Sequence, residues 1–278
     1  MPGIDRLKVR RSFDAQAHEY DRHAVVQKRV IDRIVRLLPP DISPGLILDI
    51  GSGTGALLQR MAARYAESRL MGLDMAFGMG VAARDRLAGN SRVQFVTADA
   101  EHLPFSDGSF DLVLSTSTFQ WLERLEPAFM ELRRVLQPEG RFCFALFGEQ
   151  TLFELRDSYR AALAKEGKGS PDRTHRFKSS DNVATALAVA GLELEYLVSE
   201  LEVDHYPDVP HLLRSIRRIG AGNAAPGSSR GLSERRVMLG MMAEYQRVFG
   251  GDGRIPATYE VIYGVVRKKS AATGRSAG

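Results

Sequence analysis

Apolar and polar positions follow two periods along the first 150 residues, one typical of buried strands and the other of amphipathic helices. Short apolar runs predict strands, and apolar residues recurring every three or four positions predict helices. The predicted strands are 46–50, 70–74, 93–98, 110–115 and 141–147, and the predicted helices are 25–38, 55–65, 76–87 and 126–136. This regular alternation predicts an α/β fold built on a doubly wound parallel sheet.

The second half of the chain is less regular. Helices are predicted at 151–165 and 180–190, and strands at 192–203 and 259–267. The residues between the two strands are too many for a tight connection, and we expect them to form two helical pieces over a site at the strand ends. A polar loop is expected at 166–180.

Size and composition fit one core with an added lid. The chain has 278 residues, 44% of them hydrophobic, and no stretch of about 18 to 20 apolar residues that could span a membrane. Its basic first residues do not resemble a secretory signal, so we expect a cytoplasmic protein. Cys143 is the single cysteine, which excludes a disulfide within the chain.

The net charge of +4 is unevenly distributed. It is +4 over residues 1–36, −4 over 37–150 and +4 over 151–278. Basic flanks around an acidic middle could steer an acidic partner to the flanks. Nucleic acid is not expected as a partner, because no aromatic residues are interleaved with the basic ones. The six histidines show no metal-ligand spacing, so no metal is expected.

A glycine loop follows the first predicted strand. Gly51, Gly53 and Gly55 stand at alternate positions, and Asp49 lies two residues before the first of them. Glycines allow a backbone to pass close to a ligand, because a Cβ would occupy the ligand's space. Ligands of doubly wound sheets bind at the carboxyl ends of the strands, where this loop lies.

Two further acids help to choose the ligand. The loop alone also fits a loose nicotinamide dinucleotide fingerprint, with Asp74 as the acid that follows it. A third acid, Asp99, ends the next strand, and nothing in a dinucleotide fold requires it. The adenosine of S-adenosylmethionine needs an acceptor for its ribose hydroxyls, here Asp74, and a group facing its adenine amino edge, here Asp99. This pattern favours S-adenosylmethionine as cofactor, and so a methyltransferase.

Other residues at the same edge complete the predicted cofactor site. We expect Asp49 to order the methionine end indirectly, and Ala100 to lie at the adenine with Asp99. Met75 is expected to pack on the adenine. Ser115 and Thr116, at the end of the fourth strand, are expected near the methyl group of the cofactor.

The chain resembles the class I S-adenosylmethionine-dependent methyltransferases. Along nearly its whole length it is similar to one branch, the malonyl-acyl-carrier-protein methyltransferases of biotin synthesis. The glycine loop carries the wider resemblance and says nothing about the substrate. The segments that carry the closer one are Ser12-Phe13-Asp14, Tyr20, His23-Ala24, Leu103-Pro104-Phe105, Phe119-Gln120-Trp121, His175-Arg176-Phe177 and residues 213–221. Ser52 and Glu139 depart from the residues common in that branch, at places where the backbone matters most.

The resemblance implies a seven-stranded Rossmann-like sheet with helical lid insertions. Its domain organisation would be a helical cap at 1–40, the S-adenosylmethionine-binding core at 41–150, and completion of the sheet at 151–267. The last part would contain a substrate lid at 205–254, and residues 268–278 would form a disordered tail. Tyr20 resembles a family tyrosine on an N-terminal helix that closes over the cofactor.

The implied reaction forms a methyl ester on the free carboxylate of malonyl-acyl carrier protein, in biotin synthesis. That carboxylate has an ordinary pKa near ~4 and is already a nucleophile at neutral pH, so no catalytic base is expected, only positioning. Gln120 and Trp121 are expected to line the acceptor pocket. Three arginines at helical spacing and one upstream are candidates for the malonyl carboxylate, the phosphopantetheine or the acidic carrier: Arg214, Arg217, Arg218 and Arg176.

Two alternatives remain at this point. One is a methyltransferase for a quinone precursor or another small molecule, with the same cofactor half. The other is a partner protein that binds S-adenosylmethionine without turnover. Stable membrane association is not expected for any of them.

Overall fold

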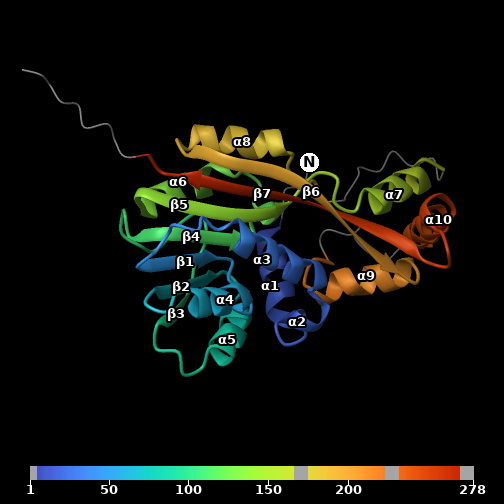
Figure 1. The fold of residues 1–278 in the computed structure, drawn as a ribbon. Helices are drawn as coiled ribbons and strands as arrows, with labels where there is room; N and C mark the ends of the chain where they lie inside the picture. The colour runs from blue at the N-terminus through green and yellow to red at the C-terminus, as the bar shows by residue number, and fades with distance from the viewer. Residues whose placement is uncertain (1–4, 166–174, 223–231, 270–278) are drawn as a thin grey trace, which may run out of the picture.

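One mixed sheet of seven strands forms the centre of the computed structural model, which describes residues 5–165, 175–222 and 232–269. The strand order is β3-β2-β1-β4-β5-β7-β6 (Figure 1). The strands are β1 (Leu46–Ile50), β2 (Arg69–Asp74), β3 (Val93–Thr97), β4 (Phe110–Thr116), β5 (Leu136–Phe147), β6 (Glu193–Tyr206) and β7 (Ile255–Arg267).

Strand β7 runs against the direction of its neighbours in the sheet. Strands β1 to β5 are parallel, whereas β7 runs antiparallel to both β5 and β6. The parallel sheet predicted from the first 150 residues is therefore confirmed for β1 to β5, and β7 adds an antiparallel strand to it. Two parallel neighbouring strands need a crossover connection over the face of the sheet. The helices between β6 and β7 lie beyond the ends of the strands instead, so the chain returns in the opposite direction (Figure 1).

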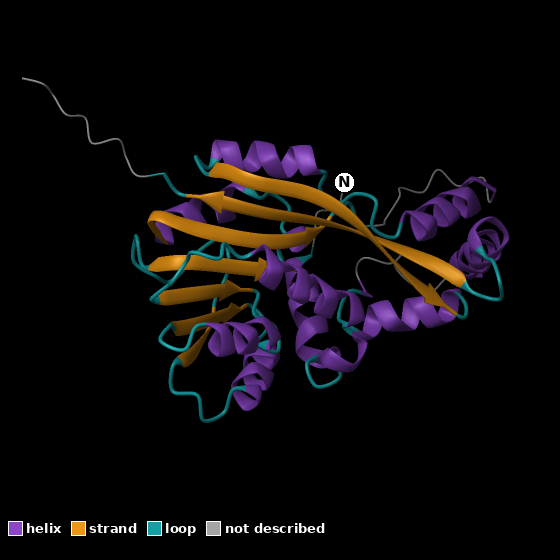
Figure 2. Ribbon diagram, viewed as in Figure 1, coloured by secondary structure: helices purple, strands orange, loops and turns teal. Residues whose placement is uncertain are grey.

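Alternate residues of the central strands face two separate hydrophobic clusters. Ile47 and Leu112 belong to the cluster that contains helix α3 (Val25–Leu37) and helix α4 (Ala56–Arg64), while Leu48 and Val113 belong to the other. That second cluster contains helices α6 (Glu126–Val135) and α8 (Ser180–Val189). Helices thus cover both faces, as a doubly wound sheet requires (Figure 2).

Two groups of helices lie beyond these layers. Near the carboxyl ends of the parallel strands, α1 (Arg6–Gln16) packs against α5 (Phe77–Arg86), and α2 (Tyr20–His23) packs against α9 (Val209–Arg218). Strands β6 and β7 extend past the sheet towards α9, α7 (Phe153–Lys165) and α10 (Leu232–Phe249) (Figure 1). The 3-10 turn η1 (Phe119–Trp121) follows β4. The prediction of two helical pieces between the last strands is confirmed by α9 and α10.

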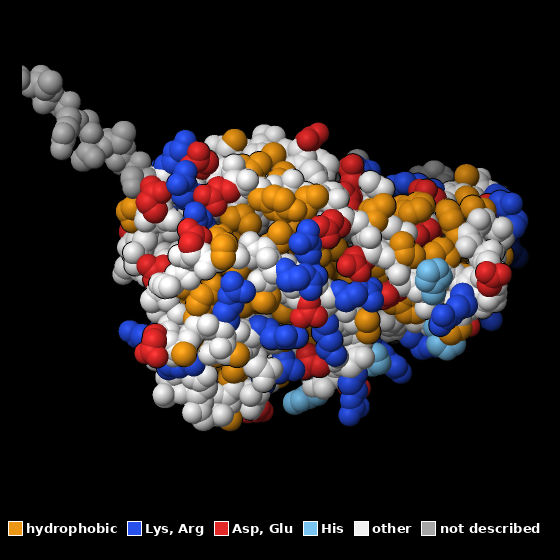
Figure 3. All heavy atoms as spheres, viewed as in Figure 1, with side chains coloured by type: hydrophobic (Ala, Val, Ile, Leu, Met, Phe, Trp, Pro, Cys, Tyr) orange, Lys and Arg blue, Asp and Glu red, His pale blue; other side chains and the backbone are white. Residues whose placement is uncertain are grey.

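Ion pairs join the N-terminal helices to the edge of the sheet. Arg29 of α3 pairs with Glu202 and Asp204 of β6, and Arg33 pairs with Glu200. Figure 3 shows blue and red side chains interleaved where α3 crosses below β6. These contacts fix α3, and with it the chain that leads into it from α1 and α2, against the long strand pair.

Some predicted segments fall outside the described residues. They are residues 1–4 of the expected cap, 166–174 of the expected polar loop, 223–231 of the expected lid and 270–278 of the expected tail. Within the described ranges, no helix is long and apolar enough to cross a membrane.

Candidate functional site

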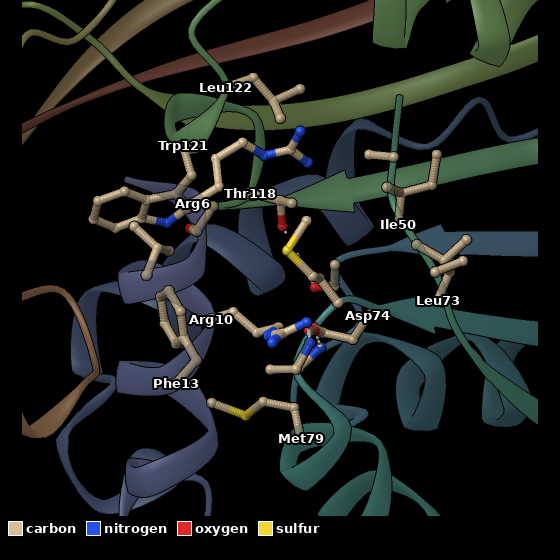
Figure 4. Close-up of a pocket in the computed structure, with 18 of the residues that line it drawn as sticks. Arg6, Arg10, Phe13, Ile50, Leu73, Asp74, Met79, Thr118, Trp121 and Leu122 are labelled. Carbon is tan, nitrogen blue, oxygen red and sulfur yellow. Dashed lines mark hydrogen bonds between the residues drawn. The ribbon is translucent and has the colours of Figure 1, made fainter. Parts of the chain in front are cut away.

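A cavity lies at the carboxyl ends of β1, β2 and β4. Its walls come from the glycine loop, the ends of the strands and the N-terminal helix α1 (Figure 4). The predicted cofactor residues that line it are Tyr20, Gly51, Gly53, Asp74, Met75, Ala100 and Thr116. The structure therefore brings together residues separated by nearly one hundred positions.

Two glycines of the loop are required for different reasons. The N–H of Gly51 donates to the carbonyl of Leu73 at 2.7 Å, and a Cβ at this residue would lie 2.0 Å from Oγ1 of Thr118. Gly53 has φ +51, and a Cβ there would meet nothing within 4 Å. Gly51 is needed for packing, whereas Gly53 leaves open space in the cavity wall where a ligand can approach the backbone. Gly55 does not line the cavity; it precedes α4 as its N-cap.

Asp74 is the acceptor group of this cavity. Its Oδ2 accepts the N–H of Gly53 at 2.9 Å, and its Oδ1 accepts the N–H of Ala76 at 2.8 Å. Burial raises the pKa of Asp74 to about 6, although these backbone hydrogen bonds oppose the shift. A carboxylate has lone pairs beyond two bonds, so ionised Asp74 can also accept ribose hydroxyls.

Asp49 lies behind the loop and does not line the cavity. It is 1% exposed, and its Oδ1 has no hydrogen-bond partner within the described part of the chain. Burial, with the charge of Asp74 as a second cause, raises the pKa of Asp49 to about 8. The side chain is thus mostly protonated at neutral pH, and any effect on a bound cofactor passes through the loop.

The predicted adenine end contains an arginine that the sequence did not single out. Ala98 and Ala100 line the cavity, but the Asp99 side chain pairs with Arg6 of α1, which also pairs with Glu101. Burial alone would raise the pKa of Asp99, but the bonds from Arg6 and from the N–H of Glu101 hold it below its ordinary value. Asp99 does not line this cavity but a neighbouring hollow, and its Oδ1 accepts from both Arg6 and the N–H of Glu101.

The structure contradicts the position expected for Ser115 at the end of β4. Ser115 is fully buried, and its Oγ donates to the carbonyl of Ile50 at 2.8 Å, so it fixes β4 to β1 rather than facing the cavity. Alternate side chains of a strand point to opposite sides, which is why Thr116 lines the cavity and Ser115 does not. Ser117 and Thr118 continue the lining beyond the strand.

The N-terminal helices close the cavity through specific contacts. Oδ1 of Asp14 in α1 accepts the N–H of Gly78 at 2.8 Å, which fixes α1 to the start of α5. Thr54 of the loop donates to Asp21 of α2 at 2.8 Å, and Arg86 of α5 pairs with the same carboxylate. These contacts support the expectation of a helical cap. They hold Phe13 and Tyr20 over the cavity.

Tyr20 is kept protonated by its surroundings. Burial is the main reason that its pKa lies far above the ordinary value, and the nearby Asp74 and Asp21 carboxylates add to the shift. Its hydroxyl is therefore a hydrogen-bond donor at any physiological pH.

A second cavity adjoins the first. The two share four lining residues, Phe13, Tyr20, Ser117 and Trp121. The rest of the second lining comes from η1, the end of β5, α9, β7 and neighbouring loops: Gln27, Gln120, Phe147, Thr151, Leu152, Phe177, Ile216, Ile219, Ala221 and Tyr259. The structure places Gln120 and Trp121 on this wall, where the sequence predicted an acceptor pocket.

His175 holds the Gln120-Trp121 pair in place. Its Nε2 is 2.9 Å from the carbonyl oxygen of Gln120, and its ring lies 5.1 Å from that of Trp121. Burial lowers the pKa of His175 to about 4, so the ring is neutral at pH 7. A carbonyl only accepts, so Nε2 carries the proton and donates it.

The four candidate arginines line neither cavity. Arg214, Arg217 and Arg218 are exposed on α9, while Leu213 and Ile216 of the same helix are buried. Arg176 is also exposed. Helical spacing placed the α9 arginines on one side of the helix correctly, but that side is the outer one. The expectation that one of them meets a carboxylate in the pocket is therefore not supported.

The described residues hold no group of three or more His, Cys, Asp or Glu side chains that could bind a metal ion. The cavity residues that the sequence missed include three on α1: Arg6, Val9 and Arg10. Figure 4 shows the Arg10 side chain extending from α1 towards Asp74. The first residues have a weak apolar period and many charges, so no signal in that segment marked them as cavity residues.

Known proteins similar to this chain are methyltransferases. Residues 48–144 match the family model described as a methyltransferase domain. A malonyl-[acyl-carrier protein] O-methyltransferase of Geobacter sulfurreducens is 53% identical over 95% of this chain and all of that relative. A biotin biosynthesis bifunctional protein of Saccharophagus degradans is 35% identical over 92% of this chain, which covers 46% of that protein. The solved structure of a putative methyltransferase from Bacillus halodurans has a TM-score of 0.62 at 19% identity, covering 86% of this chain and 99% of that one, and so shares the fold.

Proposed function

The chain belongs to the malonyl-[acyl-carrier protein] O-methyltransferase family of S-adenosylmethionine-dependent enzymes, and we propose on this basis how its two cavities divide the reaction. The enzyme transfers a methyl group to the free carboxylate of malonyl-acyl carrier protein, an ester-forming step of biotin synthesis. The first cavity holds the methyl donor, and the second receives the malonyl group.

The residues of the first cavity fit S-adenosylmethionine. Asp74 would accept the ribose hydroxyls, Met75 and Ala98 would contact the adenine, and the open wall at Gly53 would face the methionine part. The donor supplies an electrophilic methyl group on a positively charged sulfur. Tyr20 and Ser117 line both cavities, where that methyl group would have to be.

The chain needs no general base for this reaction. A malonyl carboxylate with an ordinary pKa near ~4 is ionised at neutral pH. Attack by its oxygen forms the O–CH₃ bond while the S–CH₃ bond breaks, and no proton moves. What remains for the protein is to hold the two groups in line and to exclude water, which can supply ~7 kcal/mol or more of rate acceleration.

Helix α9 would serve both parts of the carrier-bound substrate. Its buried side, with Ile216 and Ile219, lines the second cavity and would contact the malonyl-pantetheine arm. Its exposed side presents Arg214, Arg217 and Arg218 to the solvent. An acidic carrier protein docked on these arginines would direct its arm into the cavity beside them.

The observation that carries this proposal is the junction of the two cavities. Phe13, Tyr20, Ser117 and Trp121 belong to both linings, so the two cavities lie on either side of the same side chains.

The test is to incubate the enzyme with methyl-labelled donor and malonyl-acyl carrier protein. We expect one methyl group on the carrier, released by mild base as an ester is. Acetyl-acyl carrier protein, which lacks the free carboxylate, should stay unlabelled. Label on a quinone precursor but not on the malonyl carrier, or donor binding without any labelled product, would contradict the proposal.

A further inference from the structure

The wall of the second cavity contains no charged side chain among the described residues that line it. Its polar groups are uncharged: Gln27, Ser117, Gln120 and Thr151, with the hydroxyls of two tyrosines and the indole of Trp121. A carboxylate held against these described residues would meet neutral donors, whereas the charged Arg6 and Arg10 line the first cavity. This feature needs an explanation, because proteins usually bind carboxylates with arginine.

One donor of this wall has no partner. Nε1 of Trp121 is fully buried and forms no hydrogen bond within the described part of the chain. An indole N–H can only donate, and leaving such a group buried and unpaired costs on the order of 1–3 kcal/mol. An incoming acceptor would remove that cost.

The indole is held rigidly at the junction of the two cavities. The Phe13 ring packs against it edge to face, with the ring centroids 5.9 Å apart at 75°. His175 lies on another side at 5.1 Å and also binds the carbonyl of Gln120. Figure 4 shows Trp121 and Phe13 side by side at one end of the donor cavity. The N–H is thus positioned before any ligand arrives.

Other polar groups of the same wall suit other parts of the substrate. Nε2 of Gln120 donates to the carbonyl of Ser117 at 2.6 Å, which fixes the amide orientation, since that carbonyl can only accept. Oε1 of Gln120 is left buried without a partner in the described chain. It can accept from an amide N–H of a pantetheine arm, but it cannot bind a carboxylate.

A neutral donor also fits the energetics of the reaction. The negative charge of the carboxylate and the positive charge of the sulfonium disappear together as the bond forms. A hydrogen bond from a charged group is about twice as strong as a neutral one, and it would stabilise the ionised ground state more than the partly neutralised transition state. An uncharged N–H orients the carboxylate with less of this penalty.

We infer that the indole N–H of Trp121 binds the acceptor carboxylate at the junction of the two cavities, as an uncharged positioning group in place of an arginine. This inference rests on the proposed function, since it assigns the malonyl carboxylate to the second cavity.

The inference is tested by measuring how tightly the Trp121→Phe variant binds two forms of the carrier protein. With S-adenosylhomocysteine bound, the dissociation constants of malonyl- and acetyl-acyl carrier protein are compared between the wild type and the variant. We expect malonyl-carrier binding to weaken about 5- to 30-fold, the effect of one buried hydrogen bond, and acetyl-carrier binding to stay unchanged. Phe13→Leu, which alters the same ring cluster without removing a donor, should change both constants by the same factor.

Because the chain has a single tryptophan, the wild type offers an independent measurement. Its one indole N–H gives one cross-peak in a ¹⁵N-correlated NMR spectrum. Malonyl-pantetheine should move the indole proton downfield, and acetyl-pantetheine should not.

Several outcomes would overturn the inference. One is that Trp121→Phe weakens both carriers equally, which would make the indole a packing group. Another is that the malonyl probe leaves the indole proton unshifted although the wild type methylates the malonyl carrier. Failure of the proposed function would look different, because the wild type would then neither methylate the malonyl carrier nor bind it more tightly than the acetyl carrier.

Discussion

At the scale of single residues, two buried aspartates beside the glycine loop are held in different protonation states. Asp74 receives two backbone N–H groups and has a pKa of about 6, so it is mostly ionised at neutral pH. Asp49 has an oxygen without a partner within the described residues and a pKa of about 8, so it is mostly protonated. Only the first can act as a charged acceptor for a ligand.

Replacing Asp74 by alanine should weaken donor binding. The variant loses the ribose acceptor and leaves the N–H of Gly53 without its partner. We expect the affinity for S-adenosylhomocysteine, measured by calorimetry at pH 7.5, to fall by about 1–3 kcal/mol. Asp85→Ala, on the exposed side of α5, is the matched control and should bind normally. Equal affinities for both variants would remove Asp74 from the site.

The pH dependence of donor binding should follow the ionisation of Asp74. Ribose hydroxyls are bound by the ionised form, so protonation of Asp74 competes with the ligand. Affinity in the wild type should be constant above pH 7 and fall by up to tenfold per pH unit below about 6. In Asp74→Ala this dependence should be absent. A flat wild-type profile between pH 5 and 7 would contradict the assignment.

Asp49 should make the protein less stable as the pH rises. Its pKa is raised on folding, so its favourable contribution is complete below the unfolded value near ~3.9 and is lost as the pH rises towards about 8. The loss at pH 7 is on the order of 4 kcal/mol. Urea unfolding of Asp49→Asn at pH 4.5 and 7.5 should show a smaller decrease than that of the wild type. The same decrease in both proteins would mean that Asp49 does not titrate as described.

At the scale of elements, helix α9 has one side in the acceptor cavity and the other in solvent. Exposed charges at a docking surface act mainly through steering, and each is worth less than about 1 kcal/mol. Replacing Arg214 and Arg217 by glutamate reverses both charges and should therefore raise the KM for malonyl-acyl carrier protein about 5- to 10-fold. The KM for malonyl-pantetheine should not change, and thermal stability should remain near that of the wild type.

A matched control for α9 is Arg69→Glu, at the exposed start of β2 and far from the carboxyl ends of the strands. It should leave both KM values unaltered. If the α9 variant raised the KM for malonyl-pantetheine as strongly as for the carrier, the arginines would act on the cavity and not on the carrier protein.

The order of strands and helices could be predicted from the sequence, because apolar residues recur with the spacing typical of a strand or of a helix in each element of the core. All nine elements predicted between residues 25 and 147 are present, with shifted ends such as the earlier start of β5 at Leu136. The antiparallel direction of β7 could not be predicted, because apolar and polar residues alternate in the same way along parallel and antiparallel strands. It depends on where α9 and α10 pack, which is a tertiary property.

The site was predictable in part, for a similar reason. Gly53, Asp74 and Met75 follow directly from strand ends, and the sheet brings strand ends together. Ser115 and the α9 arginines were wrongly expected to face a cavity. Spacing along the sequence shows which residues share one side of a helix or strand, but it does not show which side faces the cavity. Arg6 and Arg10 belong to a helix whose docking depends on Asp14, a contact that no local pattern predicts.

At the scale of the whole molecule, the proposed function assigns the two cavities to different parts of the chain. The donor cavity lies on the sheet built from residues 46–116, under α1 and α2. The acceptor cavity is formed largely by the second half of the chain, including α9 and β7. Residues 151–278 carry +4, so an acidic carrier would meet a part of opposite charge.

The most direct test of this account is a crystal structure of the protein with S-adenosylhomocysteine. We predict that its ribose hydroxyls bind Asp74, that its adenine lies beside Met75 and Ala98, and that its sulfur points to the junction formed by Tyr20, Ser117 and Trp121. A nucleoside bound outside the glycine-loop cavity, or one whose sulfur points away from Trp121, would contradict the account.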